Sequence, residues 1–116
     1  MERRELEALL TPESLRLLAS IDTPHSPDTV VSEVARLRKQ GHSLETVSAV
    51  MGQVALRHKA REKFGTFADR MLFSAESLEV ASRLDVASHH AGRFLGAGIS
   101  SVTDAGCGLG GDALAF

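Results

Sequence analysis

Apolar residues recur every three or four positions through most of the chain, which is the period of one buried face of an α-helix. Leu, Val and Ala supply most of these positions, and charged residues fill many of the intervening ones. We therefore expect a mainly α-helical fold with an N-terminal domain of about five helices. The first predicted helix covers residues 2–10 and the second runs from 12 to about 20. The third begins at 27 and has 36–39 in its last turn, the fourth runs for about 20 residues from 44 to near 63 or 64, and the last begins at 74 and ends near 96–98. Residues 64–73 are expected to form a helical turn or an irregular connector.

Start and stop residues mark the ends of these helices. A hydroxyl at a helix start can accept a hydrogen bond from a free backbone N–H. A glycine after the last turn can adopt the left-handed conformation that ends a helix, and Gly41 and Gly65 stand at such places. Four predicted starts carry a hydroxyl residue: Thr11, Ser26, Ser43 and Ser74.

Residues 99–116 follow a different pattern. Ile99 to Asp104 is a short β-prone run, which a glycine-rich turn and the first residues of a helix follow. A strand, a glycine-rich turn and a helix in this order are found at the start of nucleotide- and cofactor-binding α/β domains. We therefore expect a helical domain over 1–98, followed at 99–116 by the first strand and glycine loop of a truncated Rossmann-like domain.

A βαβ unit needs about 30 residues or more. The tail is therefore expected to begin a domain whose remainder belongs to a longer parent protein, and the chain alone is expected to be inactive. Since the expected strand has no neighbour to pair with, we expect it to be disordered, docked irregularly on the helices or paired with another chain.

Composition narrows the function classes. The formal net charge is −2, from 13 basic and 15 acidic residues, which argues against a chain that binds polyanions over its whole surface. No stretch approaches the ~20 apolar residues of a membrane span, and the charged N-terminus does not resemble a signal peptide. The single cysteine, Cys107, excludes a disulfide within the chain. We expect a cytoplasmic protein without membrane contact; the oligomeric state stays open.

The glycine loop fits two patterns. Gly106, Gly108 and Gly111 match G-x-G-x-x-G, the dinucleotide fingerprint, whereas Gly106, Gly108 and Gly110 match G-x-G-x-G. Asp104 at the mouth of the loop would repel a pyrophosphate and attract a cationic amine or sulfonium. This acid favours S-adenosylmethionine over NAD or FAD. The alternative is that the glycines only make a tight turn.

The loop sequence Asp104-Ala-Gly-Cys-Gly-Leu-Gly-Gly-Asp112 resembles motif I of the class I S-adenosylmethionine-dependent methyltransferases, in the form found in trimethylguanosine synthases. Residues 59–74 and 87–91 resemble an actinobacterial methyltransferase family with a THUMP-like C-terminal domain. The resemblance implies that the loop contacts the methionine part of the cofactor, and it suggests RNA as the methyl acceptor. The implied cofactor-binding residues are Asp104, Gly106, Cys107, Gly108 and Gly110. Catalytic residues stay unknown, and Cys107 is interpreted as a small turn residue rather than a nucleophile.

A basic segment precedes the tail, with three Phe residues beside it. One interpretation is a cationic surface for an RNA backbone, and the other is a solvated helix end, which is what such charge runs usually form. The candidate substrate-binding residues are Arg57, Lys59, Arg61, Lys63 and Arg70. Of the histidines, His89 and His90 are adjacent and would point about 100° apart on a helix, and His58 has only Glu62 nearby. No metal site is predicted.

Three functions therefore compete. The first is the N-terminal part of an S-adenosylmethionine-dependent methyltransferase acting on RNA, with the rest of the catalytic domain in the parent chain. The second is a helical interaction module without enzymatic activity. The third is an NAD or FAD enzyme, which would need an acid about 20 residues after the loop.

Overall fold

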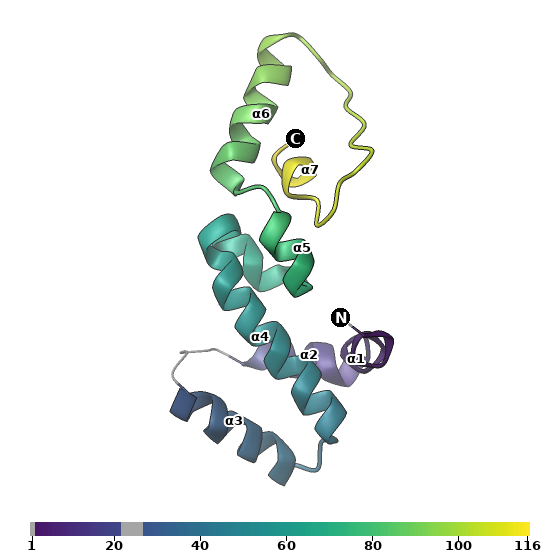
Figure 1. Cartoon of the computed structure of the whole chain (residues 1–116), viewed down its shortest axis with the longest axis vertical. Coiled ribbons are helices and arrows are strands. Elements are labelled where there is room, and N and C mark those ends of the chain that lie inside the picture. Colours follow the sequence, from purple (N-terminus) through teal and green to yellow (C-terminus); the bar gives the residue numbers. More distant parts are fainter. Residues whose placement is uncertain (1, 22–26) are drawn as a thin grey trace. The chain divides into compact units, whose positions relative to one another are not determined.

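The computed structural model describes residues 2–21 and 27–116 (Figure 1). The chain divides into two compact units, Met1–His58 and Lys59–Phe116, called unit 1 and unit 2 below. The predicted sequence boundary between residues 98 and 99 stays a prediction. The described helices are α1 (Arg3–Leu9), α2 (Pro12–Ser20), α3 (Pro27–Lys39), α4 (Leu44–Phe64), the 3-10 helix η1 (Gly65–Arg70), α5 (Ala75–Val80), α6 (Leu84–Gly96) and α7 (Gly111–Ala115).

The helix starts predicted from hydroxyl residues are confirmed at three positions. The side chains of Thr11, Ser43 and Ser74 each accept a hydrogen bond from the backbone N–H three residues further on, at 3.1, 3.2 and 3.3 Å. Ser26, the fourth predicted cap, lies outside the described residues. Gly41 has a φ of 92°, so it provides the predicted left-handed end after α3.

Unit 1 is held together by an aliphatic core between α2, α3 and the first part of α4. Leu37, Val47 and Met51 form its buried centre, and Leu17 and Val34 pack against it. These residues come from three helices whose apolar positions repeat at helical spacing, so their stripes meet in one core.

A buried hydroxyl joins α1 to α2. Ser14 is completely buried, and its Oγ donates to the carbonyl oxygen of Ala8 at 2.5 Å. The hydroxyl of Thr11 donates in turn to Ser14 Oγ at 2.9 Å. Since a buried hydroxyl is costly without a partner, these two bonds fix the turn between the helices.

Unit 2 has an aromatic centre. Phe64, at the end of α4, and Phe73, after η1, are both buried, with their ring centroids 5.8 Å apart. Ala68 of η1, Leu78 of α5 and Ala87 of α6 are also buried. Residues 64–73, expected to be a helical turn or an irregular connector, thus include the 3-10 helix η1. Its buried residue, Ala68, lies between Phe64 and Phe73 in the sequence.

The predicted long helix over residues 74–96 is wrong in one respect, because it is two helices. α5 ends at Val80 and α6 begins at Leu84. The ammonium group of Lys63 donates to the carbonyl oxygens of Leu78, Glu79 and Ala81 at 2.7, 2.9 and 2.9 Å. A cation that bonds the last carbonyls of a helix stabilises its end, so Lys63 holds the chain break after α5.

The predicted Rossmann-like strand over residues 99–104 is also wrong, because the described residues contain no β-strand. The backbone of Ser100 to Thr103 forms no hydrogen bond with any described residue, and these residues are exposed. The β propensity of Ile99, Val102 and Thr103 has no neighbouring strand to act on, and strand structure exists only through pairing. The segment instead runs as an irregular connection from α6 to α7, which pack against each other (Figure 1).

Membrane-spanning segments were sought among the described helices. None of them combines the length and the apolar character that a membrane crossing requires.

Candidate functional site

The glycine loop of unit 2 is a tight turn between the irregular connection and α7. Gly108 and Gly110 have φ values of 55° and 80°, in the left-handed region that side chains with a Cβ disfavour. The N–H of Gly110 donates to the carbonyl oxygen of Cys107 at 2.8 Å, which closes the turn. Gly106 lies in open space and has no positive φ. Two of the three G-x-G-x-G glycines are therefore required by the backbone itself.

Gly111 has a different role, because it lies against the aromatic centre of unit 2. It is buried, and a Cβ added to it would lie 3.2 Å from Cε1 of Phe64 and 3.2 Å from the carbonyl oxygen of Ser82. The absence of a side chain at this position leaves room for this close approach. Gly111 thus brings the first turn of α7 onto the core of unit 2.

Polar contacts hold α7 in the same place. Asp112 receives a hydrogen bond from the ring of His90 on α6, with 2.9 Å between Nδ1 and Oδ1. The hydroxyl of Ser82 reaches the other oxygen of Asp112 at 3.5 Å. An aromatic contact closes the far end, where the rings of Phe94 and Phe116 meet edge to face with centroids 5.3 Å apart. A five-residue helix is unstable alone, so these contacts keep α7 formed.

An acidic hollow of about 240 Å³ lies between α6, the connection and α7. Asp104 and Asp112 supply its carboxylates, and the rings of Phe94 and Phe116 supply apolar wall. Asp104 is partly exposed, and its carboxylate forms no ion pair or hydrogen bond with any described residue. A free carboxylate beside two aromatic rings is suited to a cationic ligand.

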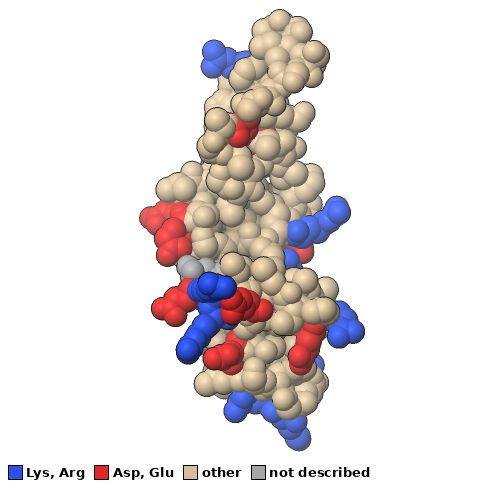
Figure 2. Space-filling model, turned by 90° about the vertical axis from the view of Figure 1, so that its right-hand side faces the viewer, with Lys and Arg blue, Asp and Glu red and all other residues tan. Residues whose placement is uncertain are grey.

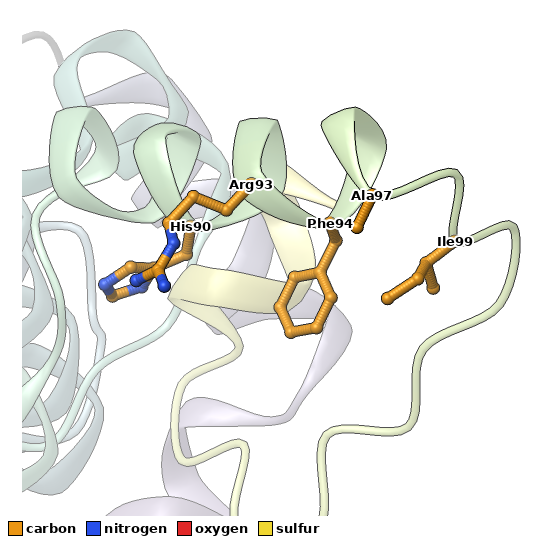
Figure 3. Close-up of a pocket in the computed structure, with 5 residues that line it drawn as sticks. All are labelled: His90, Arg93, Phe94, Ala97 and Ile99. Carbon is orange, nitrogen blue, oxygen red and sulfur yellow. The ribbon is translucent and has the colours of Figure 1, made fainter.

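A second hollow of about 420 Å³ adjoins the first and shares His90 and Phe94 with it. Arg93, Ala97 and Ile99 complete its lining, and Figure 3 shows the side chains of the five lining residues, with that of Arg93 running back toward His90. The side chains of His90, Arg93 and Phe94 are spaced by three and four residues on α6, so they emerge on one face of that helix. Within the described part of the chain, the guanidinium of Arg93 has no ion-pair or hydrogen-bond partner.

A third hollow, of about 540 Å³, lies on the other side of the loop. It is lined by residues of η1 and its end, Phe67, Arg70 and Met71, and by Gly110 and Leu114. The Phe67 side chain is 42% exposed, and the guanidinium of Arg70 has no ion-pair or hydrogen-bond partner among the described residues. An aromatic face and a free cation thus stand next to the glycine turn.

The five candidate RNA contacts differ in their surroundings. Arg61 forms an ion pair with Asp69, with 2.9 Å between Nη2 and Oδ1, and Lys63 is bound to the end of α5. Lys59 is exposed and Arg57 half-buried, both on α4. On the face drawn in Figure 2, the described Lys and Arg side chains are interspersed with acids. Arg70 lines the third hollow together with Gly110 of the loop.

The remaining chemically active side chains are placed as follows. Cys107 is exposed, and its thiol points to the carbonyl oxygen of Gly108 at 3.7 Å. His58 and His89 are exposed. Among the described residues, no three or more His, Cys, Asp or Glu side chains form a group that could hold a metal ion.

Sequence reasoning missed the α6 side of the site. The sequence analysis did not single out Arg93 or Phe94. It considered His90 for a metal site and included it in the resembling segment 87–91, without a role at the loop. The sequence shows that His90, Arg93 and Phe94 share one face of a predicted helix. This face lines hollows only because α7 packs against α6, and that packing depends on Gly111 and Asp112. Asp112 stood within the motif, and its pairing with a histidine 22 residues earlier carries no local signal.

Comparison with known proteins gives one match. A sequence model of the family described as "Domain of unknown function (DUF8688)" matches residues 2–60, a segment that nearly coincides with unit 1. Neither a curated protein nor a solved structure matches the chain. The candidate site lies outside the matched residues.

Proposed function

The chain belongs to the DUF8688 family, whose description assigns no function, and we propose that its glycine loop is the cofactor-binding loop of an S-adenosylmethionine-dependent methyltransferase. The observation that carries the proposal is Asp104, a carboxylate without a partner among the described residues, in an acidic and aromatic hollow beside a glycine turn. We propose the whole activity for a longer parent protein and none for residues 1–116 alone, since motif I holds only one part of the cofactor.

The residues of the site fit this cofactor better than a dinucleotide. A pyrophosphate in the hollow would face the carboxylates of Asp104 and Asp112, of which the second is hydrogen-bonded to the ring of His90. A sulfonium and an α-ammonium would be attracted by the same acids and by the faces of Phe94 and Phe116. When bound, S-adenosylmethionine supplies an electrophilic methyl group for transfer to a nitrogen or oxygen nucleophile.

The chain's own contribution is to position the cofactor. Gly108 and Gly110 keep the loop backbone free of side chains, so that a ligand can approach it closely. Asp104 accepts hydrogen bonds from the ammonium of the methionine part. Correct orientation of two reactants can supply much of the rate enhancement of an enzyme, so a fixed cofactor is itself a catalytic contribution.

We propose RNA as the methyl acceptor, held on the opposite side of the loop. Arg70 offers a free guanidinium to a phosphate, and Phe67 offers an aromatic face on which a base can stack. Lys59 supplies a further exposed charge. Arg61 and Lys63 are engaged in contacts within unit 2, which removes them from the expected binding surface.

Calorimetry with S-adenosylmethionine tests the proposal on the parent protein. Asp104→Asn removes a charge-assisted hydrogen bond worth about 1.5–3 kcal/mol, which corresponds to an affinity loss of roughly 10- to 100-fold. Asp28→Asn is the matched control, because Asp28 is an exposed acid in unit 1. The absence of cofactor binding by the wild-type parent would refute the enzyme hypothesis and favour the interaction module.

The RNA part has a separate test. Affinity for a single-stranded RNA is measured against salt concentration, because each lost phosphate contact lowers the slope of log affinity against log salt by about 0.7. We expect this change for Arg70→Gln and none for Arg61→Gln. Equal slopes for the wild type and Arg70→Gln would exclude Arg70 from the interface.

A further inference from the structure

One polar contact of α7 can change its strength with pH. Nδ1 of His90, on α6, lies 2.9 Å from Oδ1 of Asp112, in the first turn of α7. The two side chains are 42% and 32% exposed, so solvent protons can reach both of them. Imidazole is the side-chain group that ordinarily changes its charge between about pH 5 and pH 8. The contact is therefore a hydrogen bond from a neutral ring at high pH and an ion pair at low pH.

The charges that face the ring of His90 are mainly negative. Asp112 on α7 and Asp104 on the connection line the same hollow as the ring. Phe116 lines it as well and carries the terminal carboxylate of the chain. On α6 itself, the side chain of Arg93 runs back toward His90 (Figure 3). A positive charge on the ring thus meets more opposite than like charge.

We propose that His90 and Asp112 form a pH-sensitive clasp, which holds α7 on α6 more tightly as the pH falls. A charge-assisted hydrogen bond is stronger than one from a neutral donor, so the docked arrangement binds the added proton more tightly than the undocked one. Lowering the pH from about 7.5 to about 5.5 therefore favours docking, and raising it favours release. Ordinary carboxyl groups stay ionised over this range.

The docking of α7 rests on few contacts, so one of them is enough to shift it. The helix has five residues and would be unstable alone. The approach of Gly111 to Phe64 and the edge-to-face contact of Phe94 with Phe116 involve no group that changes its charge. The hollow beside Asp104 includes residues of α7, so its shape depends on docking. The clasp thus makes this hollow responsive to pH, whatever ligand it takes.

Amide hydrogen exchange in the chain tests the clasp. The N–H of Leu114 donates to the carbonyl oxygen of Gly110 at 2.8 Å, so its exchange reports the docking of α7. Protection is the exchange rate of an unfolded peptide of the same sequence divided by that of the chain at the same pH. Partly exposed ion pairs contribute modestly, so protection should be about two- to fivefold greater at about pH 5.5 than at about pH 7.5. Equal protection at the two pH values, or none at either, would overturn the proposal.

Two variants and a control identify the groups. His90→Gln keeps a donor for Asp112 without the change of charge, and its protection should match that of the wild type at about pH 7.5 and stay the same at about pH 5.5. Asp112→Asn removes the carboxylate and should also abolish the pH dependence. His89→Gln replaces the exposed neighbour of His90 and should keep it. A pH dependence that survives in His90→Gln, or one that is lost in His89→Gln, would assign the effect to other groups and refute the clasp. These measurements need no cofactor, so their outcome is independent of the proposed function.

Discussion

Replacement of Gly111 by alanine is the sharpest perturbation of the site, because the added methyl group has two neighbours. It would lie 3.2 Å from Cε1 of Phe64 and from the carbonyl oxygen of Ser82, whereas carbon contacts are optimal at about 3.5–4.0 Å. Both neighbours must move by a few tenths of an ångström. Overpacking of this kind costs about 1–3 kcal/mol, and alanine recovers up to about 1 kcal/mol through its helix propensity.

We therefore expect Gly111→Ala to weaken the docking of α7 by about 1 kcal/mol, roughly a fivefold change in the docked population. Amide hydrogen exchange at Leu114 reports this docking, because its N–H donates to the carbonyl oxygen of Gly110 at 2.8 Å. Exchange there should be about five times faster in the variant.

Gly106→Ala is the matched control. Gly106 lies in the same loop, has no positive φ, and an added Cβ would have no atom within 4 Å. Exchange at Leu114 should therefore match the wild type. Exchange in Gly111→Ala that is as slow as in the wild type would refute the argument that a missing side chain permits the approach of α7.

Three further substitutions test contacts elsewhere in the two units. Lys63→Met removes three hydrogen bonds of 2.7–2.9 Å to the end of α5 and should destabilise unit 2 by about 1–3 kcal/mol, whereas Lys59→Met, on the exposed part of α4, should leave its thermal midpoint unchanged. Ser14→Ala removes the 2.5 Å hydrogen bond to the half-buried Ala8, whose carbonyl keeps only the bond from Thr11 Oγ1 at 3.3 Å. It should lower the urea midpoint of unit 1 by an amount equivalent to about 0.5–1.5 kcal/mol, and an equal shift for the exposed Ser48→Ala would contradict this. Gly110→Ala forces a side chain into a φ of 80° and should destabilise the turn by about 1–2 kcal/mol, which faster amide exchange in α7 would report and unchanged exchange would disprove.

The helical part of the fold was predictable because its signals are local. Thr11 caps the start of α2 and the left-handed Gly41 follows the end of α3, each within one turn of the helix it bounds. Their positions in the sequence are therefore enough to predict these helix ends. The break between α5 and α6 was not predictable, because the group that stabilises it is Lys63, 15 residues before the first carbonyl that it bonds. Its effect exists only after unit 2 has folded.

The tail shows the same division between local and tertiary signals. Ile99 and Val102 have the β propensity that the sequence analysis used, but propensity creates no strand without a neighbour to accept its hydrogen bonds. Gly108 and Gly110 adopt the left-handed backbone of the tight turn that the sequence analysis gave as the alternative for the loop. Arg93 was missed, since a surface arginine in a helix has no distinguishing pattern until another element encloses it.

The docking of α7 has a consequence for affinity. A ligand that needs the docked arrangement binds with an intrinsic affinity multiplied by the fraction of molecules in which α7 is docked. If one molecule in ten is docked, the apparent dissociation constant is about tenfold higher than the intrinsic one, and a bound ligand raises the docked fraction in return. The close approach of Gly111 to Phe64 therefore links the packing of the core of unit 2 to the affinity of such a ligand. A substitution that disturbs the packing of Phe64 would lower the docked fraction of α7, and with it the apparent affinity, although Phe64 makes no contact with the ligand.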